Sequence, residues 1–355
     1  MENLFGKTLT ELQQLAEKQN WPAYTARQIA GWLYDRQVSS IDEMTNLSKK
    51  IREALKLDHH IELSPPKSVF SSVDGTKKYL FSLPGGYHVE TAYIPEHSRH
   101  TLCVSSQVGC RMGCSFCMTA KQGFTRNLST AEILNQVQSL PERNQLTNIV
   151  YMGMGEPLDN LEAVLNSLDI LTSPYGYAFS PRRITVSTIG MLPALTRFLQ
   201  NTRCNLAISL HSPFENERRF MVPMEKAWPM QDVLHEIRSF NLEKQRRVSF
   251  EYIVCKDWNH SIKHVNELAR KLNGIKCRMN LISFHPIPGS HFRPPDKVDM
   301  DTFQAALNAK GIITTIRKSR GQDIQAACGL LSTLAMDGKA GKGLSAVRLQ
   351  QKDIM

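Results

Sequence analysis

Short apolar stretches alternate with helical stretches from about residue 101 onward. Helical spacing occurs, for example, at 161–171 and 262–272. The strands that we expect lie at 101–105, 149–152, 183–187, 205–210, 248–254 and 279–284, with a further strand at 312–317. Such alternation is typical of right-handed β-α-β units and favours a parallel sheet or a partial barrel. The predicted fold class is therefore α/β, with the barrel over 101–335.

The first hundred residues follow a different pattern. Residues 1–75 are predicted to form a small helical domain that packs on the rest of the chain or binds a partner such as RNA. Thr8 followed by Glu11 resembles a capping box, and two more helices are expected after Pro22 and Ser48. Strand-like stretches at 77–83 and 87–94 flank a Pro-Gly-Gly turn, so 76–100 are predicted as a β-hairpin extension. Residues 336–355, rich in Gly and Lys, are predicted as a flexible basic tail.

Several classes of protein are disfavoured by the composition. No run approaches the roughly 18 apolar residues of a membrane helix. The first twenty residues lack the basic and apolar regions of a signal peptide, which predicts a cytoplasmic protein. The net charge of +10 favours a polyanionic partner, although solvated lysines alone can give the same balance. We expect a monomer, since nothing suggests an obligate dimer.

The unusual motifs fall directly after the expected strands. The cysteine-rich loop follows the first strand, MGMGEP the second, STIG the third, SLHSP the fourth and HPIPGS the sixth. Active sites of parallel α/β folds gather at the carboxyl ends of the strands. These loops are therefore expected to meet around one pocket.

The cysteine-rich loop, SSQVGCRMGCSFCMTAKQGFTRNL, contains Cys110, Cys114 and Cys117 in the spacing C-x3-C-x2-C. Three thiolates on a tight loop can hold three irons of a [4Fe–4S] cluster and leave the fourth iron open. Disulfides are less suited to a large chain without an export signal. Zinc is the main alternative, but structural zinc sites usually take four ligands in two separated pairs. Buried cysteines without a metal are the remaining alternative.

This loop, placed after the first strand of the expected barrel, resembles that of the radical S-adenosylmethionine (SAM) superfamily. The resemblance implies a partial (β/α)6 barrel in which the open iron binds SAM. It also implies that an electron from the cluster splits SAM to give a 5′-deoxyadenosyl radical. The stretch MGMGEP resembles the Gly-Gly-Glu-Pro-like motif that receives the methionine amino group, which implies that Gly155 and Glu156 bind the cofactor.

Longer stretches resemble one subfamily, the RlmN-type methyltransferases of adenine C2 in RNA, and their Cfr relatives. The resemblance covers about residues 88–331, and the N-terminal helical unit also resembles the accessory domain of that family. The stretches are TLCVSSQVGC, GFTRNLS, MGMGEPL, SPRRITVSTIG, AISLHSP, NLISFHPIPG and RKSRGQDIQAACG. The implied substrates are adenosine 2503 of 23S rRNA and adenosine 37 of tRNA. The implied electron donor is a protein such as flavodoxin with its reductase.

The subfamily resemblance implies a role for two further cysteines. One SAM methylates Cys328, and the radical from a second SAM removes a hydrogen from that methyl group. The resulting carbon radical adds to adenine and gives a covalent protein–RNA adduct. After a base removes the ring proton, Cys103 attacks the thioether, releases the product and leaves a disulfide. Glu90 matches the family's proton acceptor, and Cys103 is the competing base. Without the resemblance, both cysteines would be interpreted as core residues.

The resemblance also assigns cofactor contacts, whereas the candidates for RNA contacts come from the basic residues of the sequence. Ser187, Ser209, Leu210 and His211 match the family's SAM-binding positions, whereas His285 stands where the family typically has Asn. The cations that are candidates for phosphate contacts are Arg182, Arg183, Arg218, Arg219, Arg246, Arg247, Arg317, Lys318 and Arg320.

Three alternative functions remain open at this point. Methylation of C8 of the same rRNA adenosine would be Cfr-like, but Pro157 favours the C2 type because Cfr relatives tend to have Ala there. An iron–sulfur RNA-binding protein without catalysis would not need Cys103, Cys328 or Glu90. A radical enzyme acting on a protein is disfavoured by the basic charge and the two additional cysteines.

Overall fold

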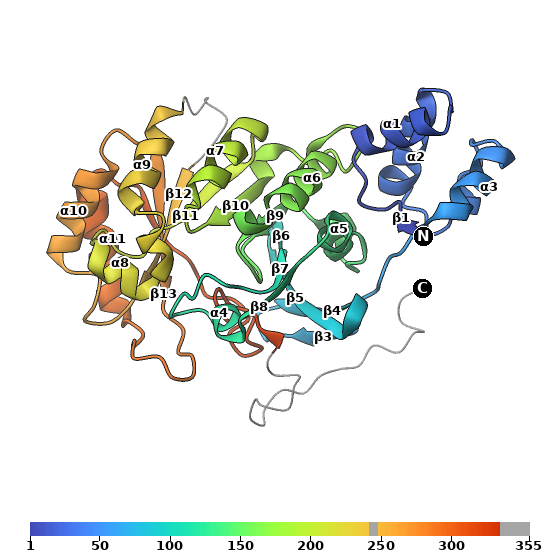
Figure 1. The fold of residues 1–355 in the computed structure, drawn as a ribbon. Coiled ribbons are helices and arrows are strands. Elements are labelled where there is room, and N and C mark those ends of the chain that lie inside the picture. Colours follow the sequence, from blue (N-terminus) through green and yellow to red (C-terminus); the bar gives the residue numbers. More distant parts are fainter. Residues whose placement is uncertain (241–247, 334–355) are drawn as a thin grey trace.

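The computed structural model describes residues 1–240 and 248–333, and a single mixed sheet runs through it (Figure 1). The strand order is β14-β13-β12-β11-β10-β9-β6-β5-β4-β3. Every neighbouring pair from β6 to β14 is parallel. The parallel strands are β6 (Arg99–Cys103), β9 (Asn148–Tyr151), β10 (Ile184–Thr188), β11 (Asn205–Ser209), β12 (Val248–Val254), β13 (Cys277–Ser283) and β14 (Thr314–Ile316). The α/β prediction is confirmed, with six parallel strands from β6 to β13 and β14 added at the edge.

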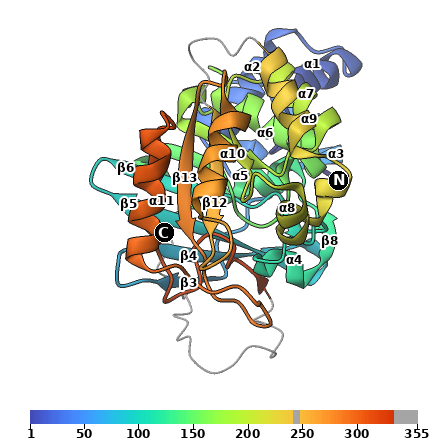
Figure 2. The same cartoon turned by 90° about the vertical axis from the view of Figure 1, so that its left-hand side faces the viewer.

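Helices connect the parallel strands and lie alongside that half of the sheet (Figures 1 and 2). The clearest case is α10, which spans the predicted range 262–272 and begins after Ser261. Its buried residues Val265, Leu268 and Leu272 recur every three or four positions, so one face packs against the core. The helices in this part of the chain are α4 (Met118–Gln122), α5 (Thr130–Gln138), α6 (Leu161–Thr172), α7 (Leu192–Asn201), α8 (Glu215–Met221), α9 (Met230–Ser239), α10 (Ile262–Leu272) and α11 (Lys297–Ala309). None of the helices in the described ranges is long and apolar enough to cross a bilayer.

The β extension is part of the main sheet. Strands β4 (Lys77–Leu83) and β5 (Tyr87–Glu96) form the expected antiparallel hairpin, and β5 pairs with β6. The turn between them contains Gly85 with a φ of 81°, a value that favours glycine. Strand β3 (Ser68–Ser71) pairs with β4, although it falls within 1–75, the range predicted as a helical domain. The β extension therefore begins before residue 76.

The N-terminal helices form as the caps predict. They are α1 (Leu9–Lys18), α2 (Tyr24–Ala30), which continues into a π-helical turn, and α3 (Lys49–Asp58). Thr8 accepts a hydrogen bond from the backbone of Glu11 at 3.2 Å, and the Glu11 carboxylate accepts one from the backbone of Thr8 at 2.7 Å. This capping box was expected. A short parallel pair, β1 (Glu2–Asn3) with β2 (His59–His60), brings the two ends of the unit together and was not predicted.

This N-terminal unit packs directly on the barrel. The ring of Tyr34 lies 6.0 Å from the ring of Tyr177, a residue that follows α6. The hydroxyl of Tyr34 accepts a hydrogen bond from the backbone of Gly6 at 3.1 Å. Gly6 approaches α5 so closely that a Cβ there would lie 2.6 Å from the backbone nitrogen of Ala131. The unit and the barrel therefore share one hydrophobic core.

Candidate cofactor and catalytic site

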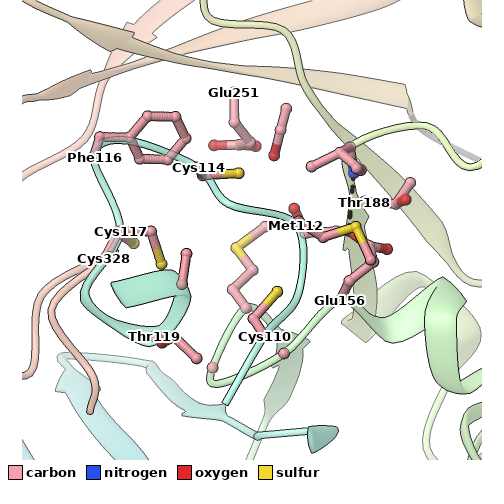
Figure 3. Close-up of a pocket in the computed structure, with 18 of the residues that line it drawn as sticks. Cys110, Met112, Cys114, Phe116, Cys117, Thr119, Glu156, Thr188, Glu251 and Cys328 are labelled. Atoms are coloured by element: carbon pink, nitrogen blue, oxygen red, sulfur yellow. Dashed lines mark hydrogen bonds between the residues drawn. The ribbon is translucent and has the colours of Figure 1, made fainter. Parts of the chain in front are cut away.

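A pocket lies at the carboxyl ends of the parallel strands, where the motif-bearing loops meet (Figure 3). It is a concave site lined by apolar side chains with a few polar groups, which suits a small-molecule ligand. The predicted site residues that line it are Cys110, Cys114, Cys117, Gly155, Glu156, Ser187, Ser209, His211 and Cys328. Cys103, Glu90, Leu210 and His285 are not among the lining residues.

The cysteine loop is supported by a two-stranded ladder, β7 (Gln107–Gly109) with β8 (Phe124–Asn127), which was not predicted. Cys110 donates its backbone N–H to the carbonyl of Gly123 at 3.0 Å. Gly109 has a φ of +73°, and a Cβ there would lie 1.6 Å from the same carbonyl oxygen. Only glycine fits this position, because the chain must turn tightly to point the cysteines into the pocket.

The three thiols fit a cluster better than a single ion. Cys110 and Cys114 are buried and Cys117 is half-buried, and all three line the pocket. Within the described residues, no three His, Cys, Asp or Glu side chains converge as a mononuclear metal site requires. An iron–sulfur cube binds each cysteine to a different iron, so its ligands need not converge on one point. These thiols would hold a [4Fe–4S] cluster.

Glu156 lies in the MGMGEP turn with both carboxylate oxygens engaged. One accepts from the backbone of Leu158 and the other from that of Ile189, each at 3.0 Å. Burial raises its pKa to about 7. Gly155 next to it has a φ of +103°, and a Cβ there would lie 2.6 Å from the Cβ of Gln107. The turn is thus held tightly against β7, beside the cysteine loop.

His211, a residue of the pocket wall, has an unused donor. Its Nδ1 accepts from the backbone of Ile253 at 3.1 Å, so the proton lies on Nε2. Nε2 is buried and finds no hydrogen-bond partner in the described part of the chain. The ring meets Phe116 of the cysteine loop edge-on, with centroids 4.6 Å apart. A buried donor without a partner on a pocket wall suits a ligand that supplies an acceptor, as the carboxylate of SAM would.

The burial of His211 predicts acid sensitivity. Its pKa is lowered to about 3, against about 6.5 in the unfolded chain. The unfolded state therefore binds a proton first as the pH falls, and stability is lost from about pH 6.5 downward. Between roughly pH 6.5 and 5 this group should lower the free energy of unfolding by about 2 kcal/mol. Urea unfolding at both pH values should show a smaller loss for His211→Asn, and an equal loss would contradict the prediction.

Cys328 faces the pocket beside Cys117 (Figure 3). Its segment is fixed on α4, because the backbone of Met118 donates to Gly329 at 2.8 Å and the hydroxyl of Thr119 donates to Leu331 at 2.6 Å. Cys328 is exposed and lines the pocket. The protein that surrounds the pocket nevertheless raises the pKa of its thiol.

Cys103 ends β6 and is buried behind the pocket wall. Burial is the main cause that raises its pKa, and Cys328 raises it further, so the two thiols lie within electrostatic reach of each other. The predicted disulfide is not present, since none of the eight cysteines, all within the described residues, forms a disulfide. In the implied reaction the disulfide forms only at the end of turnover, whereas the structure contains the reduced pair.

Glu90 lies in β5 and holds the Cys328 segment. One carboxylate oxygen pairs with Lys78 at 2.9 Å, and the other accepts from the backbone of Ser332 at 2.8 Å. Both members of the ion pair are buried, and the effect of burial on Glu90 outweighs that of Lys78, so its pKa is raised. The predicted proton acceptor therefore has both oxygens occupied and does not line the pocket.

Replacing Lys78 in this ion pair should destabilise the fold. Lys78→Met leaves the Glu90 carboxylate buried without its cation, which is expected to lower the free energy of unfolding by about 3–5 kcal/mol. Lys77→Met is the matched control, because Lys77 is 40% exposed and pairs with Glu142 near the surface. That variant should cost about 1 kcal/mol or less. Chemical denaturation measures both, and equal losses would contradict the prediction.

His285 is used inside the fold rather than on the pocket wall. Its two ring nitrogens lie 3.1 Å from the hydroxyl of Ser319 and 3.0 Å from the side-chain amide of Gln322. It thereby supports the segment that leads to Cys328. Leu210 contributes its carbonyl to an internal hydrogen bond with Arg218 at 3.2 Å.

Glu251 in β12 is a pocket residue that sequence reasoning missed. It pairs in register with Ser209, and one carboxylate oxygen accepts from Asn280 at 2.8 Å. Its other oxygen lies 3.6 Å from Nε of Arg317. The only available signal was an acidic residue within the apolar strand SFEYIV.

Not all of the basic residues predicted to contact RNA phosphates lie on an exposed surface. Arg317 lies against the pocket wall, with a guanidinium nitrogen 3.8 Å from the sulfur of Met152. Arg218 is buried, so the phosphate contact predicted for it is wrong. Arg182, Arg183 and Arg219 are exposed and remain predictions. The predicted contacts at Arg246 and Arg247 and the tail at 336–355 lie outside the described residues.

Comparison with known proteins agrees with this geometry. Residues 104–273 match the model of the Radical SAM superfamily, and residues 2–61 match the ribosomal RNA large subunit methyltransferase N-terminal domain. The chain is 53% identical to a probable dual-specificity RNA methyltransferase RlmN of Bacteroides thetaiotaomicron, covering 93% of this chain and 96% of that one. It is 41% identical to the dual-specificity RNA methyltransferase RlmN of Nitratiruptor sp., and the match covers 93% of this chain and 98% of that one.

A solved structure is similar throughout. The radical SAM methyltransferase from Sphaerobacter thermophilus matches with a TM-score of 0.85 and 40% identity, covering 93% of this chain and 99% of that one. Membership of the superfamily implies a [4Fe–4S] cluster and SAM, which the pocket fits. The matching domains, the relatives and the shared fold together show that the chain belongs to the RlmN family of radical SAM RNA methyltransferases.

Proposed function

We propose that the protein forms 2-methyladenosine at adenosine 2503 of 23S rRNA and at adenosine 37 of tRNA. One observation carries the proposal: Cys328, far along the chain, lines the same pocket as the three cysteines of the 110–117 loop. C2 of adenine is an electron-poor carbon that does not attack a sulfonium methyl group as an amine would. A sulfur that can hold a methyl group beside a radical source meets this difficulty.

The pocket residues have distinct roles in this proposal. Cys110, Cys114 and Cys117 hold the cluster, which when bound supplies the electron that cleaves SAM. Gly155, Glu156, Ser187, Ser209 and His211 orient the cofactor from the pocket wall, while Leu210 and His285 act from behind it.

Two cysteines carry the methyl group and release the product. The sulfur of Cys328 accepts a methyl group from one SAM. After the radical from a second SAM removes a hydrogen from this group, its carbon bonds to the base while still attached to the sulfur, so each turnover uses two SAM molecules. Cys103 then attacks that sulfur, which breaks the sulfur–carbon bond and forms the disulfide, and the released carbon takes up a proton to become the methyl group of the product. The place of Cys103 within electrostatic reach of Cys328 supports this role. Glu90 is the candidate proton acceptor, and it must first break the hydrogen bond that it accepts from the backbone of Ser332. Cys103 is the competing base.

The C2 position is favoured over C8 by Pro157 and by the relatives named RlmN. The name of those relatives, dual-specificity RNA methyltransferase, supports two RNA substrates. We further propose a cytoplasmic monomer that receives electrons from a flavodoxin and its reductase.

Mass spectrometry of 23S rRNA and tRNA from a strain without the gene tests the function. Loss of 2-methyladenosine from both RNAs, restored by the intact gene but not by Cys328→Ala, is the expected result. Loss of 8-methyladenosine would instead support the Cfr-like reaction. Unchanged nucleosides would support an RNA-binding protein without catalysis.

A further inference from the structure

Arg218 in α8 is buried beneath the pocket, where it binds the ends of two strands. Its side chain is only 1% exposed. Nε donates to the carbonyl of Leu210 at 3.2 Å, and Nη2 donates to those of Ile189 and Ser209 at 2.8 and 3.0 Å. Ile189 and Ser209 line the pocket directly after β10 and at the end of β11. The guanidinium therefore joins the two strand ends that carry cofactor-binding positions.

The partner of Arg218 extends this network. Nη1 of Arg218 forms a buried ion pair with Glu225, whose carboxylate also accepts from the backbone of Met230 at the start of α9. Removing two charges from water costs free energy that a buried pair often fails to recover. Such a pair is weak evidence for a contribution to stability, so its role is better sought in what it arranges.

The same helix contacts the cysteine loop. The backbone of Ser115 donates to the carbonyl of Met221 at 3.0 Å, and a Cβ on Gly113 would lie 3.7 Å from the ring of Pro223, just beyond the helix. Burial raises the pKa of the Cys114 thiol, and the guanidinium of Arg218 is close enough to oppose that rise.

A second connection leads to the MGMGEP turn. Ile189 accepts from Arg218 through its carbonyl and donates its N–H to Glu156 at 3.0 Å. One peptide segment thus connects the buried cation to a carboxylate predicted to bind the cofactor.

We propose that Arg218 is a positioning residue that fixes the cofactor-binding strand ends against the cysteine loop and places a permanent positive charge beside the iron–sulfur cluster. The proposal depends on the proposed function only in that the three cysteines hold a cluster. A nearby cation favours the state of the cluster that has gained an electron, because attraction is strong in a poorly solvated interior. Arg218 should therefore make the cluster easier to reduce.

Two substitutions separate the charge from the hydrogen bonds. Arg218→Gln removes both and should shift the midpoint potential of the cluster to more negative values, with about tenfold weaker SAM binding. Arg218→Lys keeps the charge but not the fork of donors, so the potential should stay near that of the wild type while SAM binding weakens. Arg219→Gln, at the exposed neighbouring position, should change neither.

The measurements use the full chain, reconstituted without oxygen and without RNA. Iron is counted, the potential is followed by electron paramagnetic resonance, and SAM binding is measured by equilibrium dialysis. A fully loaded Arg218→Gln protein with unchanged potential and SAM affinity overturns the proposal. If Arg218→Gln does not fold, the Glu225→Gln variant is measured instead. Removing the carboxylate leaves the charge of Arg218 unneutralised, which should shift the midpoint potential of the cluster to less negative values. An unchanged potential would overturn the proposal. Since RNA methylation is not measured, failure of the proposed reaction would leave this test intact, whereas a wild type without iron would overturn both.

Discussion

Replacing Cys103 with alanine is expected to trap the protein on its RNA. In the proposed reaction the sulfur of Cys328 is bonded to the adenine through the transferred carbon, and only a second thiol can break that bond. Cys103 is buried behind the pocket wall within electrostatic reach of Cys328, and among the described cysteines only Cys328 and the three cluster ligands line the pocket itself. Denaturing gels and protein mass spectrometry should show one RNA bound per chain, with multiple turnover abolished.

Three variants make this result specific. Cys328→Ala should give neither adduct nor product, and the double variant of Cys103 and Cys328 should also give no adduct. Cys204→Ala is the matched control, because Cys204 is buried just before β11 and does not line the pocket. It should turn over normally. An enzyme with Cys328→Ala that still methylates RNA would refute the mechanism.

Replacing a cluster-binding cysteine should remove the iron–sulfur cluster rather than trap an RNA adduct. Cys114→Ala leaves two thiols for a cube that needs three, so the reconstituted protein should lose most of its iron. Methylation should fall by at least about a thousand-fold, because radical formation has no other source in this site. Cys114 is buried among apolar residues, so alanine should be tolerated by the fold.

Cys255 provides the matched comparison for this second result. It belongs to the same apolar cluster as Cys114 and is fully buried, but it does not line the pocket. Cys255→Ala should retain the iron content of the wild type. Iron and sulfide analysis, with circular dichroism to check folding, measures both proteins. Equal iron in the two variants would contradict the assignment of the ligands.

Sequence reasoning predicted the longer elements because their periodicity is local. Helix α10 lies where the pattern placed it, since its cap and its apolar face are contained in twelve consecutive residues, 261–272. The pairs β1 with β2 and β7 with β8 were missed. Their strands have only two to four residues, too few for an alternating pattern, and β1 pairs with a strand more than fifty residues away.

The site was only partly accessible from the sequence. The motifs located the cysteine loop and the MGMGEP turn, because their residue types and spacing are rare. Arg218 and Arg219 show what the sequence could not provide: they are identical neighbours, and the helix turns one into the core and the other to solvent. Glu251 was missed for a related reason, since a buried carboxylate is recognised only when Asn280 and Arg317 are seen beside it.

The hydrogen bond from Ser332 to Glu90 spans 242 positions of the chain. Through this bond, the segment that carries Cys328 rests on a strand that lies outside the parallel half of the sheet. The two segments therefore form one exchangeable unit, and chimeras between relatives should transfer β4 and β5 together with the C-terminal segment. A transplanted C-terminal segment without its own β hairpin would lose the anchor that holds its cysteine at the pocket.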